Sequence, residues 1–289
     1  MTRALAILLL ACFACDEGGA PAEMRTLRSA DVPAYLRMVG EDREKLFRGV
    51  QEAARRVVPA FRDPDVDASE RASRVTTMLE RIDAERRGVA ELVFSPVLYL
   101  GATDGDGELL AQKGARSGDL VGVGADYAGW DVVKEALAGR AGHAVVDLAD
   151  VLPADEGPID TWLFAAPIFV GDAEVAGAFV AGIPLWREAQ RLTAQIRLES
   201  AERVASGEVL WAYLVRGPQA YASREPPAST DITDAIPDAA ARAAGLATKP
   251  DGYVTQMPLF RRWYGLAVIP LPTLAEDVHL VAFRANAMD

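Results

Sequence analysis

The sequence predicts an α+β fold, with long N-terminal helices followed by two units that are each built on an antiparallel sheet. Three observations support this prediction. Apolar residues recur at three- and four-residue steps from about residue 31 to residue 93, which is the period of a helix. From Ser95 onward, short apolar runs alternate with Asp/Gly turns, as is typical of strands and hairpins. After a further helical stretch at 186–205, the order of hairpin, loop, short helix and strands returns.

Two helices are expected at the start of the folded body, after a short linker at 23–29. The first begins near Asp31 and ends before Pro59. The second begins near Asp67 and carries an apolar stripe as far as Leu92. Arg and Glu fill the outer faces, which is typical of helices with one solvated side.

The two units contain ten expected strands. In the first unit, the turn Asp104-Gly105-Asp106-Gly107 lies between two apolar runs and predicts a hairpin, and 130–137 predicts a short helix. In the second unit, 237–244 predicts another short helix. The expected strands are 97–101, 108–111, 144–147, 161–169, 174–184, 209–215, 219–223, 252–259, 263–271 and 278–284.

The first 22 residues predict a secretory signal peptide and tether. Arg3 precedes the apolar run 4–15, which is shorter than the roughly 20 residues that a membrane-spanning helix needs. Both cysteines of the chain, Cys12 and Cys15, lie at the end of this run. That placement resembles a bacterial lipoprotein signal, in which a cysteine after the cleavage point carries lipid. Cys15 is favoured over Cys12 because the polar tether 16–19 follows it, and an ordinary secretory signal is the alternative.

Composition excludes several classes of function. The net charge is −12 and the isoelectric point is near 4.8, which argues against a nucleic-acid partner. Beyond Cys15 the chain has no cysteine, which excludes disulfides, zinc-thiolate sites and thiol catalysis in the body. His143 and His279 are far apart and lack a metal-binding context. No catalytic constellation and no cofactor motif is found, so we expect a protein that is not an enzyme.

Three segments carry a resemblance to a known family: Val97–Gln112 (VLYLGATDGDGELLAQ), Trp130–Gly139 (WDVVKEALAG) and Leu163–Ile183 (LFAAPIFVGDAEVAGAFVAGI). They resemble the extracytoplasmic Cache sensor domains of bacterial receptors, which have a PAS-like fold. The likeness covers about residues 31–200, and the second unit would be the smaller, membrane-proximal half of a double Cache module. Together with the N-terminal signal, the resemblance divides the chain into three expected parts: a lipoprotein signal and tether at 1–22, a helical stalk with the first PAS-like unit at 23–200, and a second PAS-like unit at 201–289.

The resemblance also implies a ligand site between the central sheet and the segment that follows the first hairpin. Transferred by position, this site involves Tyr99, Tyr127, Trp130, Asp147 and Trp162. The aromatic residues would wall a small ligand and Asp147 would pair with an amine, although each aromatic residue is equally consistent with plain core. The amino-acid-binding subclass has an arginine before this helix, and this chain has none at 127–131. No specific ligand therefore follows.

The expected function is that of a lipid-anchored, extracytoplasmic, small-molecule-binding protein, on the periplasmic side of a bacterial membrane or on the cell surface. No second apolar stretch approaches membrane-spanning length, so such a sensor would act through a separate membrane partner. The alternative is a non-catalytic interaction or scaffold lipoprotein that uses a PAS-like fold as a docking surface.

Overall fold

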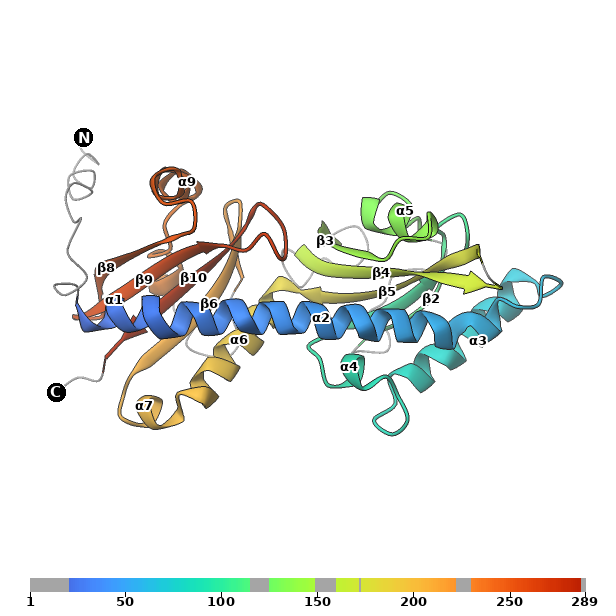
Figure 1. Cartoon of the computed structure of the whole chain (residues 1–289), viewed down its shortest axis with the longest axis horizontal. Coiled ribbons are helices and arrows are strands. Elements are labelled where there is room, and N and C mark those ends of the chain that lie inside the picture. The colour runs from blue at the N-terminus through green and yellow to red at the C-terminus, as the bar shows by residue number, and fades with distance from the viewer. Residues whose placement is uncertain (1–20, 115–124, 149–159, 172, 222–229, 287–289) are drawn as a thin grey trace.

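The computed structural model describes residues 21–114, 125–148, 160–171, 173–221 and 230–286. Two five-stranded antiparallel sheets follow one another along a single helical rod, which gives the molecule an elongated shape (Figure 1). The predicted α+β class, with N-terminal helices and two antiparallel sheets, is confirmed.

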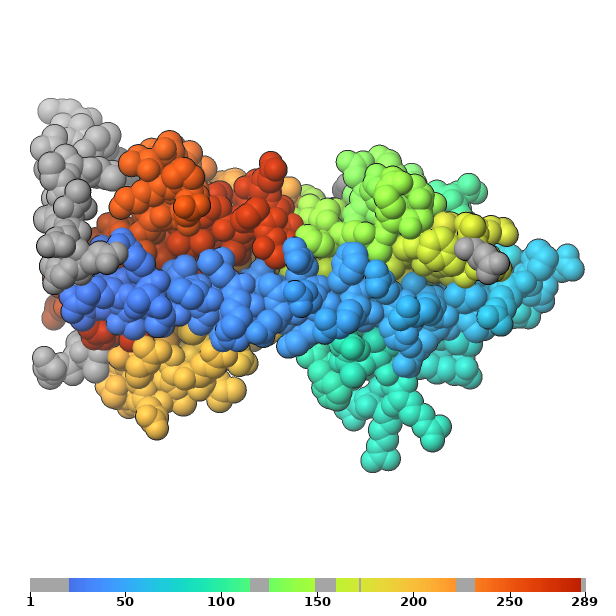
Figure 2. All heavy atoms as spheres, in the orientation of Figure 1, coloured from blue at the N-terminus to red at the C-terminus, as the bar shows by residue number. Residues whose placement is uncertain are grey.

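The rod consists of α1 (Ala22–Thr26), a π turn η1 (Leu27–Asp31) and α2 (Val32–Val57). At about 1.5 Å per residue it is roughly 54 Å long, enough to lie along both sheets. Figure 2 shows it running over both halves of the molecule with its outer side uncovered. The π turn ends two residues before Pro33, whose missing N–H and ring disrupt regular α-helical bonding in the preceding turn.

The linker predicted at 23–29 is wrong, because this segment is helical. It is held by the second sheet: Leu27 is fully buried, and the backbone of Glu23 lies so close to Gly265 that an added Cβ there would be 3.3 Å away. Tertiary packing therefore extends the helix beyond the point where its apolar period becomes clear.

After the rod, η2 (Val58–Ala60) leads to α3 (Ala68–Ile82), which starts where Asp67 Oδ1 accepts a hydrogen bond from the Glu70 N–H at 2.9 Å. The helix predicted to continue to Leu92 instead ends at Ile82. Arg87 has a φ of 70°, and the chain re-enters a helix only at α4 (Ala90–Val93). The apolar pattern of the sequence nevertheless extends to Leu92, because Leu92 is buried in the same hydrophobic core as the residues of α3.

The first sheet has the strand order β2-β1-β5-β4-β3. Its first hairpin closes at the predicted Asp/Gly turn, where Asp104 Oδ1 accepts hydrogen bonds from the N–H groups of Asp106 and Glu108 at 3.0 and 2.9 Å. The short helix α5 (Asp131–Leu137) covers the face of the sheet away from the rod. The strands are β1 (Tyr99–Thr103), β2 (Leu109–Gly114), β3 (Gly142–Asp147), β4 (Asp160–Val170) and β5 (Glu174–Pro184).

The second sheet has the order β7-β6-β10-β9-β8. This is the order of the first sheet, with each strand number raised by five. It follows α6 (Leu185–Glu199) and α7 (Ala201–Ala205), where a single helix to Ala205 was predicted, and it also carries α8 (Thr230–Thr233) and α9 (Ala239–Thr248). Its strands are β6 (Val209–Arg216), β7 (Gln219–Tyr221), β8 (Tyr253–Leu259), β9 (Arg262–Pro270) and β10 (Val278–Ala285).

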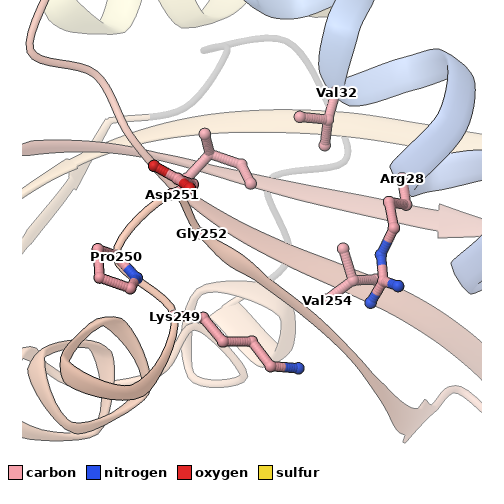
Figure 3. Close-up of a pocket in the computed structure, with 8 residues that line it drawn as sticks. Arg28, Val32, Lys249, Pro250, Asp251, Gly252 and Val254 are labelled. Carbon is pink, nitrogen blue, oxygen red and sulfur yellow. The ribbon is translucent and has the colours of Figure 1, made fainter. Parts of the chain in front are cut away.

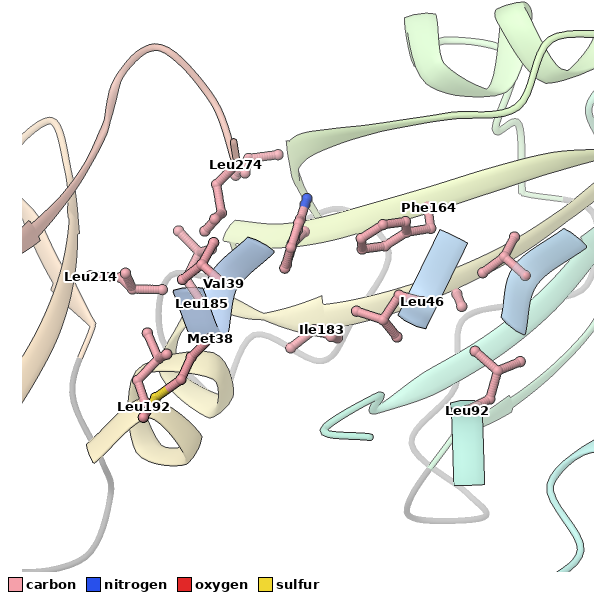
Figure 4. Packing of buried hydrophobic residues seen from close by; sticks show 14 of the residues in the cluster. Met38, Val39, Leu46, Leu92, Phe164, Ile183, Leu185, Leu192, Leu214 and Leu274 are labelled. Atoms are coloured by element: carbon pink, nitrogen blue, oxygen red, sulfur yellow. The ribbon is translucent and has the colours of Figure 1, made fainter. Parts of the chain in front are cut away.

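One hydrophobic core runs under the rod from one sheet to the other. Figure 4 shows it passing from Leu46 on α2 and Phe164 on the first sheet, through Leu185 at the start of α6, to Leu214 and Leu274 in the second unit. The two sheets are therefore joined by continuous packing, with α2 and α6 between them.

The described chain begins and ends at the same end of the molecule. Asp31 in the π turn is 1% exposed and accepts a hydrogen bond at 2.8 Å from Arg284, which is 2% exposed and one residue from the end of β10. This contact joins the rod to the second sheet, so the first sheet is the end farther from Ala22 and Ala285 (Figure 1). Within the described chain, no helix has both the length and the apolar composition that crossing a bilayer requires. The two candidate lipidation positions, Cys12 and Cys15, lie outside the described residues.

Candidate functional site in the first unit

Tyr99 is the first of the predicted site residues, and its side chain is seated against the backbone of the neighbouring strand. It begins β1 and pairs with Gly182 on β5. A Cβ at Gly182 would lie 2.1 Å from Tyr99 Cε1, so the phenol ring occupies the space above a residue that has no side chain. Gly182 therefore fixes the position of the ring on the face of the sheet that α5 covers.

Tyr127 lies on the same face and in the same cluster of buried residues as Tyr99. Its backbone N–H donates to the carbonyl of Gly107 at 2.9 Å, and Asp126 forms a bridge with Glu108, so the chain is fixed beside the first hairpin. The Tyr127 hydroxyl donates to Gln112 Oε1 at 3.5 Å. These contacts hold the ring beside the first hairpin.

Trp130 completes an aromatic pair with Tyr127. The ring centroids are 4.5 Å apart, with an angle of 51° between the planes. The backbone N–H of Trp130 also donates to the backbone carbonyl of Tyr127 at 3.2 Å. Tyr127 is fully buried, whereas Trp130 is half-buried and sits at the N-terminal cap of α5. The predicted residues Tyr99, Tyr127 and Trp130 are therefore brought together in one place.

The electrostatic character of this group is that of desolvated phenols. Burial, with a smaller contribution from Tyr127, raises the pKa of Tyr99 well above its ordinary value, and burial raises that of Tyr127. Both hydroxyls are therefore neutral at physiological pH. The Tyr99 hydroxyl is buried and has no hydrogen-bond partner within the described part of the chain. A buried hydroxyl without a partner is costly, so such a group is a candidate for bonding to a ligand.

Asp147 lies elsewhere. It is exposed at the end of β3, and β3 is three strands away from β1, which at about 4.8 Å per strand is roughly 14 Å. In the pairing of β3 with β4 it lies opposite Asp160. Asp160 accepts hydrogen bonds from Arg216 at 2.7 Å and from the Tyr221 hydroxyl, and both of these donors belong to the second unit. Asp147 therefore belongs to the junction between the units and does not face Tyr127.

Trp162 lies on the opposite face of the first sheet. It is fully buried in the core beneath the rod, with its ring 4.7 Å from that of Phe164. Its Nε1 donates to His143 Nδ1 at 3.2 Å, and burial lowers the pKa of His143, which favours the neutral ring that can accept this bond. The sheet itself separates Trp162 from Tyr99 and Tyr127.

Two residues of the aromatic group were missed by the sequence reasoning. Gly182 gave no signal beyond a glycine within an apolar strand, because only the strand register shows that Tyr99 lies opposite it. Gln112 was hidden by an irregularity in the pairing of β1 with β2 near Ala102, which breaks the alternation that assigns strand residues to faces.

A hollow lies on the second unit, between the π turn and the start of β8 (Figure 3). Its volume is about 440 Å³. Its charged lining residues are Arg28, Lys249 and Asp251. Its apolar lining includes Val32 from α2 and Val254 from β8. All three charged side chains are exposed, so solvent screens their interaction with a ligand.

The fold is that of the ligand-binding domains of bacterial sensor proteins, of the Cache or PAS-like type. No family model and no curated protein matches the sequence. Among solved structures, the ligand-binding domain of the Campylobacter jejuni chemoreceptor Tlp3, in complex with 4-methylisoleucine, matches with a TM-score of 0.52 and 12% identity, over 94% of this chain and 95% of that one.

Two further sensor proteins are similar. A domain of a protein described as a sensory box/GGDEF family protein from Vibrio parahaemolyticus matches with a TM-score of 0.54 and 11% identity, over 89% of this chain and 94% of that one. The extracellular domain of a protein described as the histidine kinase vpHK1S-Z8 matches with a TM-score of 0.53 and 10% identity, over 88% of each chain. At these identities the likeness is one of fold.

Proposed function

We propose that this protein is an extracytoplasmic, membrane-anchored sensor that binds a small molecule in its first unit and acts through a separate membrane partner. Three observations support this: the fold shared with sensor ligand-binding domains, the signal-like N-terminus, and the position of the first sheet at the end away from both described chain ends. The observation that carries the proposal is the buried Tyr99 hydroxyl, which has no hydrogen-bond partner among the described residues and lies beside the Tyr127–Trp130 pair.

The chemistry of this group favours an uncharged or cationic ligand with a hydrogen-bonding group. Tyr99 offers a hydroxyl that can donate or accept, and the faces of Tyr127 and Trp130 can pack against a flat or positively charged group. The aromatic group itself includes no basic side chain that would neutralise a carboxylate. Recognition in this proposal therefore depends on aromatic contact and a hydroxyl.

A thermal-shift screen of the full chain in detergent tests this proposal, using amines, amino acids, organic acids and nucleobases. A ligand at about 100 times its dissociation constant should add roughly 2.7 kcal/mol of stability. We expect a saturable shift from at least one neutral or cationic compound, lost in Tyr99→Phe and Trp130→Ala.

Asp147→Asn is the matched control, since Asp147 lies at the junction of the units and its variant should keep the shift. If no class of compound gives a saturable shift, the sensor proposal fails. The alternative, a scaffold lipoprotein that uses the fold as a docking surface, then becomes the better explanation.

The anchor is a separate part of the proposal. We propose Cys15 as the lipidated residue, with Cys12 as the alternative. Growing cells with a labelled fatty acid should label the wild-type chain and the Cys12→Ser variant, and should leave Cys15→Ser unlabelled. Label in Cys15→Ser that disappears in Cys12→Ser would assign the lipid to Cys12, and no label in the wild type would contradict lipidation.

A further inference from the structure

The hairpin between β8 and β9 extends beyond the rest of the second sheet. Its last pair is Leu259 with Arg262, whereas β10 pairs with β9 only as far as Gly265, opposite Arg284. The three residues from Gly265 back to Arg262 therefore project past the end of the β10 ladder, by about 10 Å at 3.3 Å per residue. We call residues 259–263 the hairpin tip.

The hairpin tip exposes large aromatic side chains. Phe260 is 48% and Trp263 is 56% exposed, and they are among the most exposed large hydrophobic residues that the structure describes. Arg261 is exposed beside them, and Arg262 lies with its guanidinium 5.6 Å from the centre of the Tyr264 ring. The sequence Leu-Phe-Arg-Arg-Trp contains no acid, in a protein whose net charge is −12. Exposed Trp and Phe next to Arg are typical of protein surfaces that sit in the interface of a bilayer.

The backbone of the hairpin tip supports a role beyond folding. Phe260 and Arg261 have φ values of 50° and 64°, the left-handed conformation that a two-residue turn of this kind requires at both positions. Asn and Gly are the residues that favour this conformation, and Phe and Arg adopt it with strain. Phe260 and Arg261 thus occupy a turn that would form more easily with Asn and Gly at these two positions.

The hairpin tip lies at the end of the molecule where a membrane would be. α1 begins there and β10 ends there, and residue 21 follows directly on a sequence whose apolar run predicts a membrane-targeting signal (Figure 1). Two acids of this part of the second unit are engaged within the protein. Glu208 is committed to Arg284 at 2.5 Å, and Glu23 is half-buried against the sheet.

We propose that the hairpin tip is a membrane-contact element that inserts Phe260 and Trp263 into the interface of a bilayer, with Arg261 and Arg262 against anionic lipid headgroups. The tip gives the body a second point of contact besides its N-terminal chain. Two contacts define an orientation, with the rod and the first sheet directed away from the bilayer.

Quenching of tryptophan fluorescence by lipids brominated on their acyl chains tests this contact directly. The full chain is reconstituted in vesicles of phosphatidylcholine with a minor share of phosphatidylglycerol. We expect the brominated lipid to quench part of the emission of the wild-type chain, and Trp263→Phe to lose most of that quenching. Trp130→Phe is the matched control, because Trp130 is a partly exposed tryptophan of the first unit, and its variant should keep the quenching.

Two further variants separate the contributions of the tip. Phe260→Asn combined with Arg261→Gly supplies the favoured turn sequence, so it should fold at least as well as the wild type and still reduce the quenching. Arg261→Gln with Arg262→Gln should reduce quenching in vesicles with phosphatidylglycerol more than in pure phosphatidylcholine.

Equal quenching in the wild type and Trp263→Phe would overturn the proposal. A tip that faces a second copy of the chain would instead show Trp263 protected from an aqueous quencher in the absence of lipid, increasingly so as protein concentration rises, and this result would also overturn it. Neither result depends on ligand binding by the first unit, which the Tyr99→Phe thermal shift reports independently.

Discussion

The two sheets have the same strand order and the same rod on one face, but they differ on the opposite face. In the second unit that face is closed by paired rings: Trp211 stacks on Tyr264 at 5.8 Å, and Tyr213 meets Phe283 edge-on at 5.7 Å. In the first unit the corresponding face contains the buried Tyr99 hydroxyl that no described group satisfies.

Buried arginines also distinguish the units. In the second unit Arg242 donates to the carbonyls of Pro237 and Gly217, and Arg284 bonds to Asp31 and Glu208. The fully buried basic residues that the structure describes both belong to this unit. The same topology thus supports two arrangements: the second sheet holds the chain ends together, and the first carries the Tyr99 hydroxyl beside an aromatic pair.

The largest expected effect comes from breaking the second unit at Arg284. Arg284→Met would leave the carboxylate of Asp31 buried without its main partner, and removing one member of a buried ion pair typically costs about 3–5 kcal/mol. Urea denaturation should show a loss of that size in the free energy of unfolding.

Arg203→Met is the control for that measurement. Arg203 also approaches Asp31, at 3.6 Å, but its side chain is exposed enough for solvent to screen the interaction, so a change of at most about 1 kcal/mol is expected. Equal losses in both variants would show that the buried Arg284–Asp31 ion pair does not contribute specifically to stability.

Gly182→Ala tests whether the Tyr99 ring packs directly against Gly182 in the first unit. The new methyl group would overlap the phenol ring, and overpacking of this kind costs about 1–3 kcal/mol. Gly129→Ala adds the same methyl group nearby with no atom within 4 Å, and should change the free energy of unfolding by less than about 0.5 kcal/mol. Similar small effects in both would mean that Tyr99 is not held against Gly182.

The joint between the units contains a titratable cluster. Asp42 on α2 contacts Arg191 on α6, which also bonds Glu188 at 3.0 Å, and Lys45 lies one turn further along α2. Burial and the neighbouring Glu188 raise the pKa of Asp42 to about 7. The folded protein then holds a proton that the unfolded chain releases above about pH 4.

The contribution of Asp42 to stability should therefore fall as pH rises from about 4 to 7, by at most about 1.4 kcal/mol per pH unit, with no further change above pH 7. Asp42→Asn should flatten this dependence when melting temperature is measured across the range. Glu41→Gln, at an exposed neighbouring position, should leave it unchanged. A wild-type slope that survives in Asp42→Asn would assign the proton to another group.

Much of the fold follows from local patterns in the sequence. The Asp104–Gly107 hairpin and the long strands up to Pro184 were predictable because alternation and turn chemistry are local. The helical segment at 23–29 was not, because its apolar contacts are with a sheet more than 200 residues later in the chain. The same limit applies to the predicted site residues. Trp162 lies on the opposite face of the sheet and Asp147 lies at the junction of the units, and neither position can be predicted from residue type because both depend on strand register.

The smallest and most specific effect is expected at the Tyr99 hydroxyl. Tyr99→Phe removes one oxygen that has no partner among the described residues, so the free energy of unfolding without ligand should stay unchanged or rise by up to about 1 kcal/mol. Tyr127→Phe removes a hydroxyl that donates to Gln112 and should cost about 0.5–1.5 kcal/mol instead. A stability loss in Tyr99→Phe would mean that the hydroxyl is already satisfied within the protein, and the main reason for placing the ligand in the first unit would disappear. A variant that keeps its stability but no longer responds to a compound that shifts the wild type would show that this hydroxyl serves the ligand and not the fold.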